Sequence, residues 1–155
     1  DAALGLLDST RTDVQDLGRD LLWRDIDGLT PIEAGAIVER LAQHTHQNVH
    51  RVAMDVLLRT PAASVVLRPA LLPLFRSALF DLSPDHALKR SILVLLREAG
   101  RRTEENGRLA LPLLIDFLGT QGLQDFELVL AALVEIRLAF PALESPVQLV
   151  PGAAA

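Results

Sequence analysis

The sequence predicts an all-α fold, namely a right-handed α-solenoid of antiparallel helix pairs. One amphipathic pattern recurs four times along the chain, and a second apolar series lies between its copies at the same spacing. Half of the 155 residues are hydrophobic, which is enough for one domain with a sizeable core. At about 40 residues per helix pair, the chain holds about three to four repeats, or about seven to eight helices.

The repeated pattern is clearest in residues 47–59, whose sequence is QNVHRVAMDVLLR. Five apolar residues follow one helix face at positions i, i+3, i+4, i+7 and i+8, namely Val49, Val52, Ala53, Val56 and Leu57. Asn48 is placed to cap the first turn, while His50, Arg51 and Asp55 fall off the apolar stripe. This segment therefore predicts an amphipathic helix.

Three further segments fit the same template, with one polar exception at Ser91. The matching residues are Val14, Leu17, Gly18, Leu21 and Leu22; Leu88, Ser91, Ile92, Leu95 and Leu96; and Phe126, Val129, Leu130, Leu133 and Val134. The first positions of the four copies lie 35, 39 and 38 residues apart. This constant spacing is typical of helical repeats.

A second apolar series occupies the intervals between these helices. Its anchors, Val38, Phe75 and Leu114, lie 37 and 39 residues apart. Because both series keep one period, we favour a repeat array over a non-repetitive helical bundle, in which any two amphipathic helices would also align.

Capping residues, prolines and glycines set the expected ends of the helices. Residues 30–33 combine a capping box with a proline at the first helical position. A truncated helix is expected over residues 1–8, and residues 101–107, RRTEENG, are expected to form a polar loop. The other expected helices cover residues 13–25, 31–43, 47–59, 64–68, 69–81 or 73–81, 85–100, 108–118 and 124–139.

These elements predict one helical-repeat domain over residues 1–140 and a non-helical tail over residues 141–155. The chain opens inside a repeat, so we expect it to be a fragment of a longer array. The helix over residues 124–139 is apolar on nearly all sides. It is therefore expected to be covered, or to mediate self-association.

Composition narrows the classes of function. Cysteine is absent, which removes disulfides, zinc-thiolate sites and thiol nucleophiles and fits a cytoplasmic location. The net charge of −5 argues against nucleic acid as a partner, and no apolar run approaches the 18 residues of a membrane span. Lys89 is the only lysine, a bias that we interpret as the codon usage of a bacterium with a GC-rich genome.

The only histidine cluster is His44, His46 and His50, in the sequence HTHQNVH. His46 and His50 are four residues apart and could share a helix face as ligands to zinc, nickel or copper. No HExxH motif accompanies them, and the alternative is a set of solvated histidines at a helix start. We therefore expect no cofactor and keep a metal-binding enzyme domain as an alternative.

An arginine cluster surrounds the expected polar loop. It comprises Arg97, Arg101, Arg102 and Arg108, interleaved with Glu98, Glu104 and Glu105. These arginines could bind phosphate or an acidic peptide, but the local charge nearly cancels. Trp23, the only tryptophan, is expected to be buried against the neighbouring repeat.

The segments TDVQDLGRDLL and QNVHRVAMDVLL resemble the first helices of HEAT or armadillo-type repeats. In that family a polar cap precedes a valine, a small residue and an aliphatic pair, here Val49, Ala53, Val56 and Leu57 in the second segment. Gln15 and His50 stand where the family usually has arginine. The resemblance covers about residues 2–140, and it implies stacked helix pairs with a long curved surface. Iron-binding members of the group carry His-Glu pairs, which this sequence lacks.

The resemblance implies a protein-interaction scaffold without catalysis of its own, whose partner is another protein or a peptide. Second helices usually line the concave face of such arrays. The candidate binding residues on that face are Glu39, Arg40, Gln43, Arg76, Ser77, Asp116 and Thr120. The alternatives are a nucleic-acid-binding domain that uses the arginine ridge and a metal enzyme that uses the three histidines.

Overall fold

The computed structural model describes residues 2–81, 85–120 and 125–144. Within these ranges the regular elements are all helical, which confirms the all-α fold class. The α-helices are α1 (Ala2–Leu7), α2 (Thr12–Asp25), α3 (Pro31–Ala42), α4 (Gln47–Arg59), α5 (Leu72–Arg76), α6 (His86–Gly100), α7 (Glu104–Thr120) and α8 (Phe126–Ala139). Three 3-10 turns separate or precede helices, namely Ile26–Gly28, Ala62–Ser64 and Pro69–Leu71. A π-helical turn, Ser77–Asp81, extends α5. In the described part, no helix combines the length and the apolarity needed to cross a bilayer.

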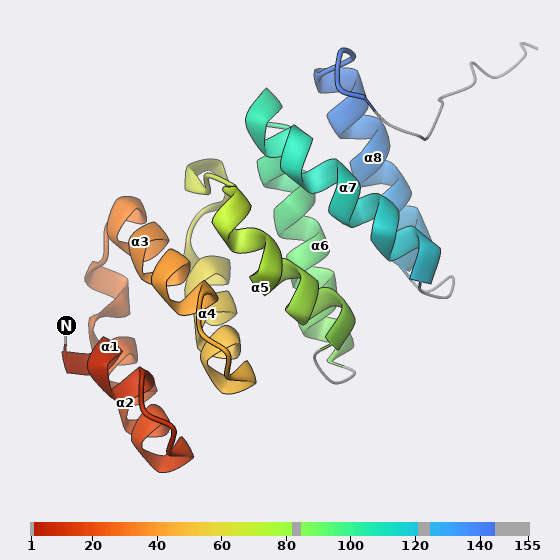
Figure 1. Ribbon diagram of the computed structural model, residues 1–155. Helices are drawn as coiled ribbons and strands as arrows, with labels where there is room; N and C mark the ends of the chain where they lie inside the picture. Colours follow the sequence, from red (N-terminus) through yellow and green to blue (C-terminus); the bar gives the residue numbers. More distant parts are fainter. Residues whose placement is uncertain (1, 82–84, 121–124, 145–155) are drawn as a thin grey trace, which may run out of the picture.

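The helices follow one another across the molecule in chain order from α1 to α8 (Figure 1). One row is formed by α2, α4, α6 and α8, in which each helix contacts the next. In the other row, α3 contacts the turn that leads into α5, and α5 contacts α7. Most helices therefore touch only elements that are close to them in the sequence.

Local signals set several helix ends as expected. The Thr30 hydroxyl accepts a hydrogen bond from the Glu33 amide at 3.3 Å, and the Glu33 carboxylate accepts one from the Thr30 amide at 2.8 Å. This reciprocal capping box starts α3 with Pro31 at its first position. The Asp85 carboxylate caps α6 by accepting from the Leu88 amide at 3.0 Å. Helix α8 ends at Ala139, two residues before Pro141.

The predicted short helix over residues 64–68 is wrong. Residues 65–68 are extended, with backbone angles φ −75° and ψ 120° at Val65 and φ −127° and ψ 153° at Arg68. Val65 and Leu67 are buried while Val66 and Arg68 are exposed, which is the alternation of an extended chain. Pro69 explains the change, because a proline drives the preceding residue out of the helical region.

The predicted polar loop over residues 101–107 is also wrong, because α7 begins at Glu104 and leaves a link of only three residues. The Thr103 hydroxyl accepts from the Asn106 amide at 3.2 Å and so caps this helix. Asn48 is not a cap either, because α4 begins at Gln47 and His46 occupies the capping position. The expected start of the last helix, at residue 124, lies outside the described residues.

The buried face matches the template stripe on α4 but departs from it on α2 and α8. Gln15 and His50, which the template left outside the stripe, are buried, whereas Leu17 is 53% exposed. Phe126 and Leu130 are likewise exposed on α8. The template therefore identified the right helices but misplaced part of the buried face.

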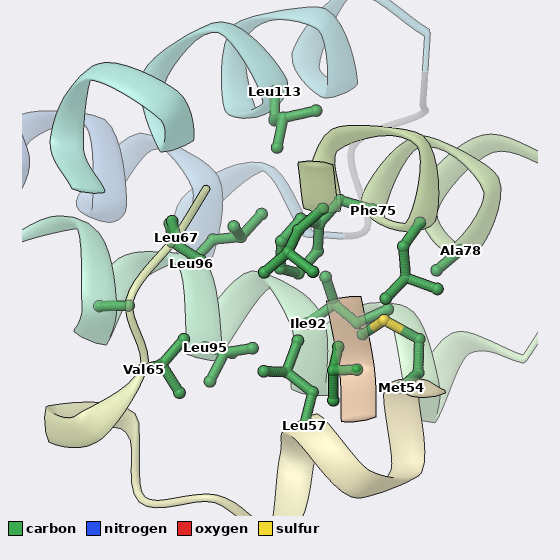
Figure 2. Packing of buried hydrophobic residues seen from close by; sticks show 14 of the residues in the cluster. Met54, Leu57, Val65, Leu67, Phe75, Ala78, Ile92, Leu95, Leu96 and Leu113 are labelled. Carbon is green, nitrogen blue, oxygen red and sulfur yellow. The ribbon is translucent and has the colours of Figure 1, made fainter. Parts of the chain in front are cut away.

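A single apolar core runs between successive helices. Met54 and Leu57 of α4 meet Phe75, Ile92 of α6 and the extended residues around Val65 (Figure 2). Trp23 is half-buried, and the Arg59 guanidinium of α4 lies 4.6 Å from its ring centroid. The predicted packing of Trp23 against the neighbouring pair is thus partly confirmed.

Asn106, which is 3% exposed, joins three separate parts of the chain. Its side-chain oxygen accepts from the Leu67 amide at 2.8 Å. Its side-chain nitrogen donates to the carbonyl oxygens of Val65 at 3.1 Å and Ala99 at 3.0 Å. The start of α7 is thereby tied to the end of α6 and to the extended residues 65–68, whose buried backbone groups would otherwise lack partners.

The ends of α6, α7 and α8 approach closely at two glycines. A Cβ on Gly107 would lie 2.9 Å from Leu143 Cδ1, 3.0 Å from the Gly100 carbonyl oxygen and 3.1 Å from Ile136 Cγ2. Leu143, from the non-helical residues after α8, is buried on this glycine. The described start of the predicted tail therefore contributes to the core.

We expect the substitution Asn106→Ala to lower the free energy of unfolding by about 2–4 kcal/mol, because three buried backbone groups lose their partners. Urea denaturation followed by circular dichroism measures this change. The matched control is Asn48→Ala, at an exposed position, which should change the value by less than about 0.5 kcal/mol. Equal effects of the two substitutions would contradict the assigned role of Asn106.

The substitutions Gly107→Ala and Gly35→Ala should change the stability of the protein in opposite directions. Gly107→Ala should destabilise the protein by about 1–3 kcal/mol, because backbone and core side chains already occupy the space. A Cβ on Gly35 meets nothing within 4 Å, so alanine there should stabilise α3 by about 0.5–1 kcal/mol. Thermal unfolding of both variants measures the two changes. If both substitutions stabilise or both destabilise the protein, the packing described for these glycines is contradicted.

Candidate functional site

Most of the residues predicted for a binding face form cross-links between successive elements. Glu39 pairs with Arg68 at 3.0 Å, and Arg40 pairs with Asp8 at 2.7 Å. The Gln43 side chain donates to the Ala70 carbonyl oxygen at 3.2 Å. Arg76 of α5 pairs with Asp116 of α7 at 2.9 Å. Exposed pairs of this kind contribute little stability, but they already occupy the polar groups that a partner would have to engage.

The other two predicted residues carry less information. Ser77 is half-buried in the turn after α5. The Thr120 side chain, at the last residue of α7, lies outside the described part of the structure. The binding role of the whole predicted set stays a prediction.

The arginine cluster is largely neutralised by acidic side chains. Arg97 forms a two-point hydrogen bond with Glu135 of α8, and Arg101 lies 3.7 Å from the same carboxylate and also pairs with Glu98. Arg108 pairs with Glu104 at 2.9 Å. The hydrogen bond from Arg97 lowers the pKa of Glu135 below its ordinary value. Arg97 therefore joins α6 to α8, and three of the four arginines in the cluster are paired with carboxylates.

The three histidines do not converge. His46 is the capping residue of α4 and has an extended backbone, and its carbonyl oxygen accepts from the His50 amide at 3.2 Å. The rings of His44 and His46 lie 5.1 Å apart, whereas His50 is buried. Among the described residues, no group of three histidine, aspartate, glutamate or cysteine side chains could hold a metal ion.

His50 is unusual in another way. Only 9% of the residue is exposed, and neither ring nitrogen has a hydrogen-bond partner among the described groups. An unpartnered buried polar group costs free energy. His50 therefore weakens the core beside α4 and does not form a ligand set.

A groove between α3 and the extended residues 65–68 forms a concave apolar site, and we call it the α3 groove. Its floor is formed by Val38, Leu57, Val65 and Leu71. Its walls are Ile32, Gly35, Ala36 and Glu39 on α3, and Val66 and Arg68 on the extended segment. The hollow has a volume of about 220 Å³.

The walls of the α3 groove leave large apolar groups in solvent. Ile32 is 84% exposed and Val66 is 58% exposed, which are high values for side chains of this size. The wall residues on α3 recur at i, i+3, i+4 and i+7, so they form one helix face. Gly35 lies in the middle of that face and leaves open space where a side chain would stand.

Sequence reasoning identified only Glu39 among the residues of this groove. Ile32 was assigned to a capping motif, and Val66 to a helix that does not form. The available signal was Gly35, because a glycine inside a helical pattern costs stability and often marks a packing or functional requirement. The second wall comes from the following helix pair, and only the structure brings it there.

Comparison with protein-family models, with curated proteins and with solved structures finds no match to this chain. The functional argument therefore depends on the geometry and chemistry of the chain's own residues.

We expect His50→Leu to raise the free energy of unfolding by about 1 kcal/mol, because it removes two unpartnered ring nitrogens from the core. Chemical denaturation at pH 8 measures the effect. His46→Leu is the control, since His46 is exposed, and should leave stability nearly unchanged. A clear loss of stability in the His50 variant would indicate that the imidazole has a partner.

The pair between Arg97 and Glu135 predicts an acid-sensitive contribution to stability. The pKa of Glu135 is lower in the folded protein than in the unfolded chain, where it is about 4.3. At pH values between these two pKa values, Glu135 therefore binds more protons in the unfolded chain than in the folded protein. This contribution is present above the unfolded pKa and is lost as the pH falls through the folded pKa.

We therefore expect Glu135→Gln to lower the melting temperature at pH 7 and to reduce the loss of stability on acidification below about pH 4. Melting curves across this range measure both effects. The exposed Glu144 provides the control substitution Glu144→Gln. An unchanged acid profile in the Glu135 variant would show that this pair does not contribute.

Proposed function

We propose that this chain is a protein-interaction module, in which helix pairs stack as a HEAT-like right-handed α-solenoid and the α3 groove binds a segment of another protein. The observation that carries the proposal is the exposure of Ile32 and Val66 on opposite walls of an apolar hollow. Exposed apolar groups around a concave surface are typical of interaction sites. The row of successive helix contacts supports the array, because repeat units contact mainly their neighbours.

The size and chemistry of the groove favour a side chain of a partner over a small molecule. Its volume of about 220 Å³ falls below the range of about 300–1,000 Å³ that is usual for small-molecule sites. Its lining is mainly aliphatic, and the two charged residues at its rim, Glu39 and Arg68, lie 3.0 Å apart. This composition suits insertion of one or two aliphatic side chains.

The two alternatives receive less support. A nucleic-acid interface needs basic groups that are free to contact phosphates, and the arginines around α6 and α7 are mostly paired with carboxylates. A metal enzyme needs converging ligands, which the three histidines do not provide.

Capture of partners from nuclease-treated lysate of the source cells tests the proposal. Immobilised wild-type chain should retain a specific protein, and the double substitution Ile32→Asp and Val66→Asp should reduce its recovery about tenfold or more, because charges replace the apolar walls. The control is Leu138→Asp on α8, where the side chain is 70% exposed but lies away from the groove.

Undiminished capture by the double variant would contradict the groove as the binding site. Selective loss with Leu138→Asp would assign binding, or self-association, to α8. Recovery of nucleic acid without nuclease treatment, lost at moderate salt, would support the arginine ridge.

A further inference from the structure

The extended residues 65–68 use only one of their two backbone edges. The Leu67 amide donates to Asn106 Oδ1 at 2.8 Å, and the Val65 carbonyl oxygen accepts from Asn106 Nδ2 at 3.1 Å. In an extended chain the backbone groups of alternate residues point to opposite sides. The amides of Val66 and Arg68 and the carbonyl of Val66 therefore point away from Asn106. Among the described residues these three groups have no hydrogen-bond partner.

The residues that carry this free edge, Val66 and Arg68, line the α3 groove. Leu67, whose amide bonds to Asn106, does not line it, and neither does Asn106. An apolar hollow and a short unpaired strand edge thus adjoin each other.

We propose that the α3 groove takes an extended peptide segment of a partner protein, which pairs as a β-strand with residues 65–68. This inference rests on the proposed function and specifies the form of its partner. The peptide would accept a hydrogen bond from the Val66 amide and donate one to the Val66 carbonyl oxygen. A helical ligand satisfies its own backbone groups and would leave this edge unused.

The side chains on the edge define the chemistry of the peptide. Val66 and Arg68 lie on the same, exposed face of the segment, two residues apart. Cross-strand neighbours favour β-branched or other apolar partners opposite Val66, and opposite charge beside Arg68. Arg68 contacts Glu39 through one nitrogen at 3.0 Å and keeps further N–H donors for a second carboxylate.

The geometry therefore predicts a peptide motif with an aliphatic residue and, two positions away, an acidic residue. The aliphatic side chain, or its neighbour on the groove side, would fill the space above Gly35. The carboxylate would complement the charge of Arg68.

A displayed library of random octapeptides, selected on the full 155-residue chain, tests this directly. Enriched peptides should carry an aliphatic and an acidic residue two positions apart, and their affinities are then measured by fluorescence anisotropy. Val66→Pro should weaken binding about tenfold, because proline removes the amide donor. Val65 already has backbone angles that a following proline accepts. Val66→Thr, which keeps the amide and the branched shape, is the matched control.

Two further reagents make the outcome independent of folding effects. A peptide that is N-methylated at the residue donating to the Val66 carbonyl should bind about tenfold more weakly to unmodified protein. Gly35→Leu should block the groove, because the added side chain enters its open space. Circular dichroism confirms that each variant is folded.

The outcomes separate this inference from the proposed function. If Gly35→Leu abolishes binding of the selected peptides while Val66→Pro and N-methylation leave their affinity unchanged, the β-strand pairing is wrong. In that case the groove remains a binding site for a partner protein. The pairing is equally wrong if no octapeptide binds while lysate capture still depends on Ile32 and Val66. Peptide binding that Gly35→Leu leaves unchanged would overturn the groove itself.

Discussion

The hydrogen bonds of Asn106 are the interaction on which the rest of the structure most depends. Residues 65–68 are extended, with Pro69 keeping Arg68 out of the helical region, so their backbone groups need partners outside regular secondary structure. Asn106 supplies these partners on the side that faces the core. Val65, Val66 and Arg68 of the same segment line the α3 groove. One buried side-chain amide therefore ties α6 and α7 to the extended segment that forms one wall of the candidate site.

The charged residues of the chain complement this arrangement. Arg40 pairs with Asp8 and Arg76 pairs with Asp116, across 32 and 40 positions of the sequence, and Arg97 with Glu135 joins α6 to α8. Each exposed pair contributes little stability, but together they neutralise most of the arginines. The groove combines exposed aliphatic side chains, Ile32 and Val66, with backbone groups that lack hydrogen-bond partners among the described residues. Those features favour recognition of a polypeptide.

The sequence was informative where structure depends on local chemistry. The capping box at Thr30, the stop at Pro141 and the spacing of apolar stripes predicted most helices and the all-α class. The sequence was misleading where a residue bonds to distant parts of the chain. Asn106 was placed in a polar loop, because its hydrogen-bond partners Val65 and Leu67 lie about 40 residues away and no local pattern shows them. The groove was missed for the same reason, since its two walls come from different helix pairs. Nothing local to α4 indicates the burial of His50.

Amide hydrogen exchange at residues 65–68, measured by NMR on the free protein, tests the central claim most directly. The account predicts a protected amide at Leu67, whose hydrogen bond to Asn106 is buried, between rapidly exchanging amides at Val66 and Arg68. Protection of Val66 comparable to that of Leu67 would mean that the edge is already paired. Rapid exchange at all three would mean that Asn106 does not hold the segment, and either result would contradict the account.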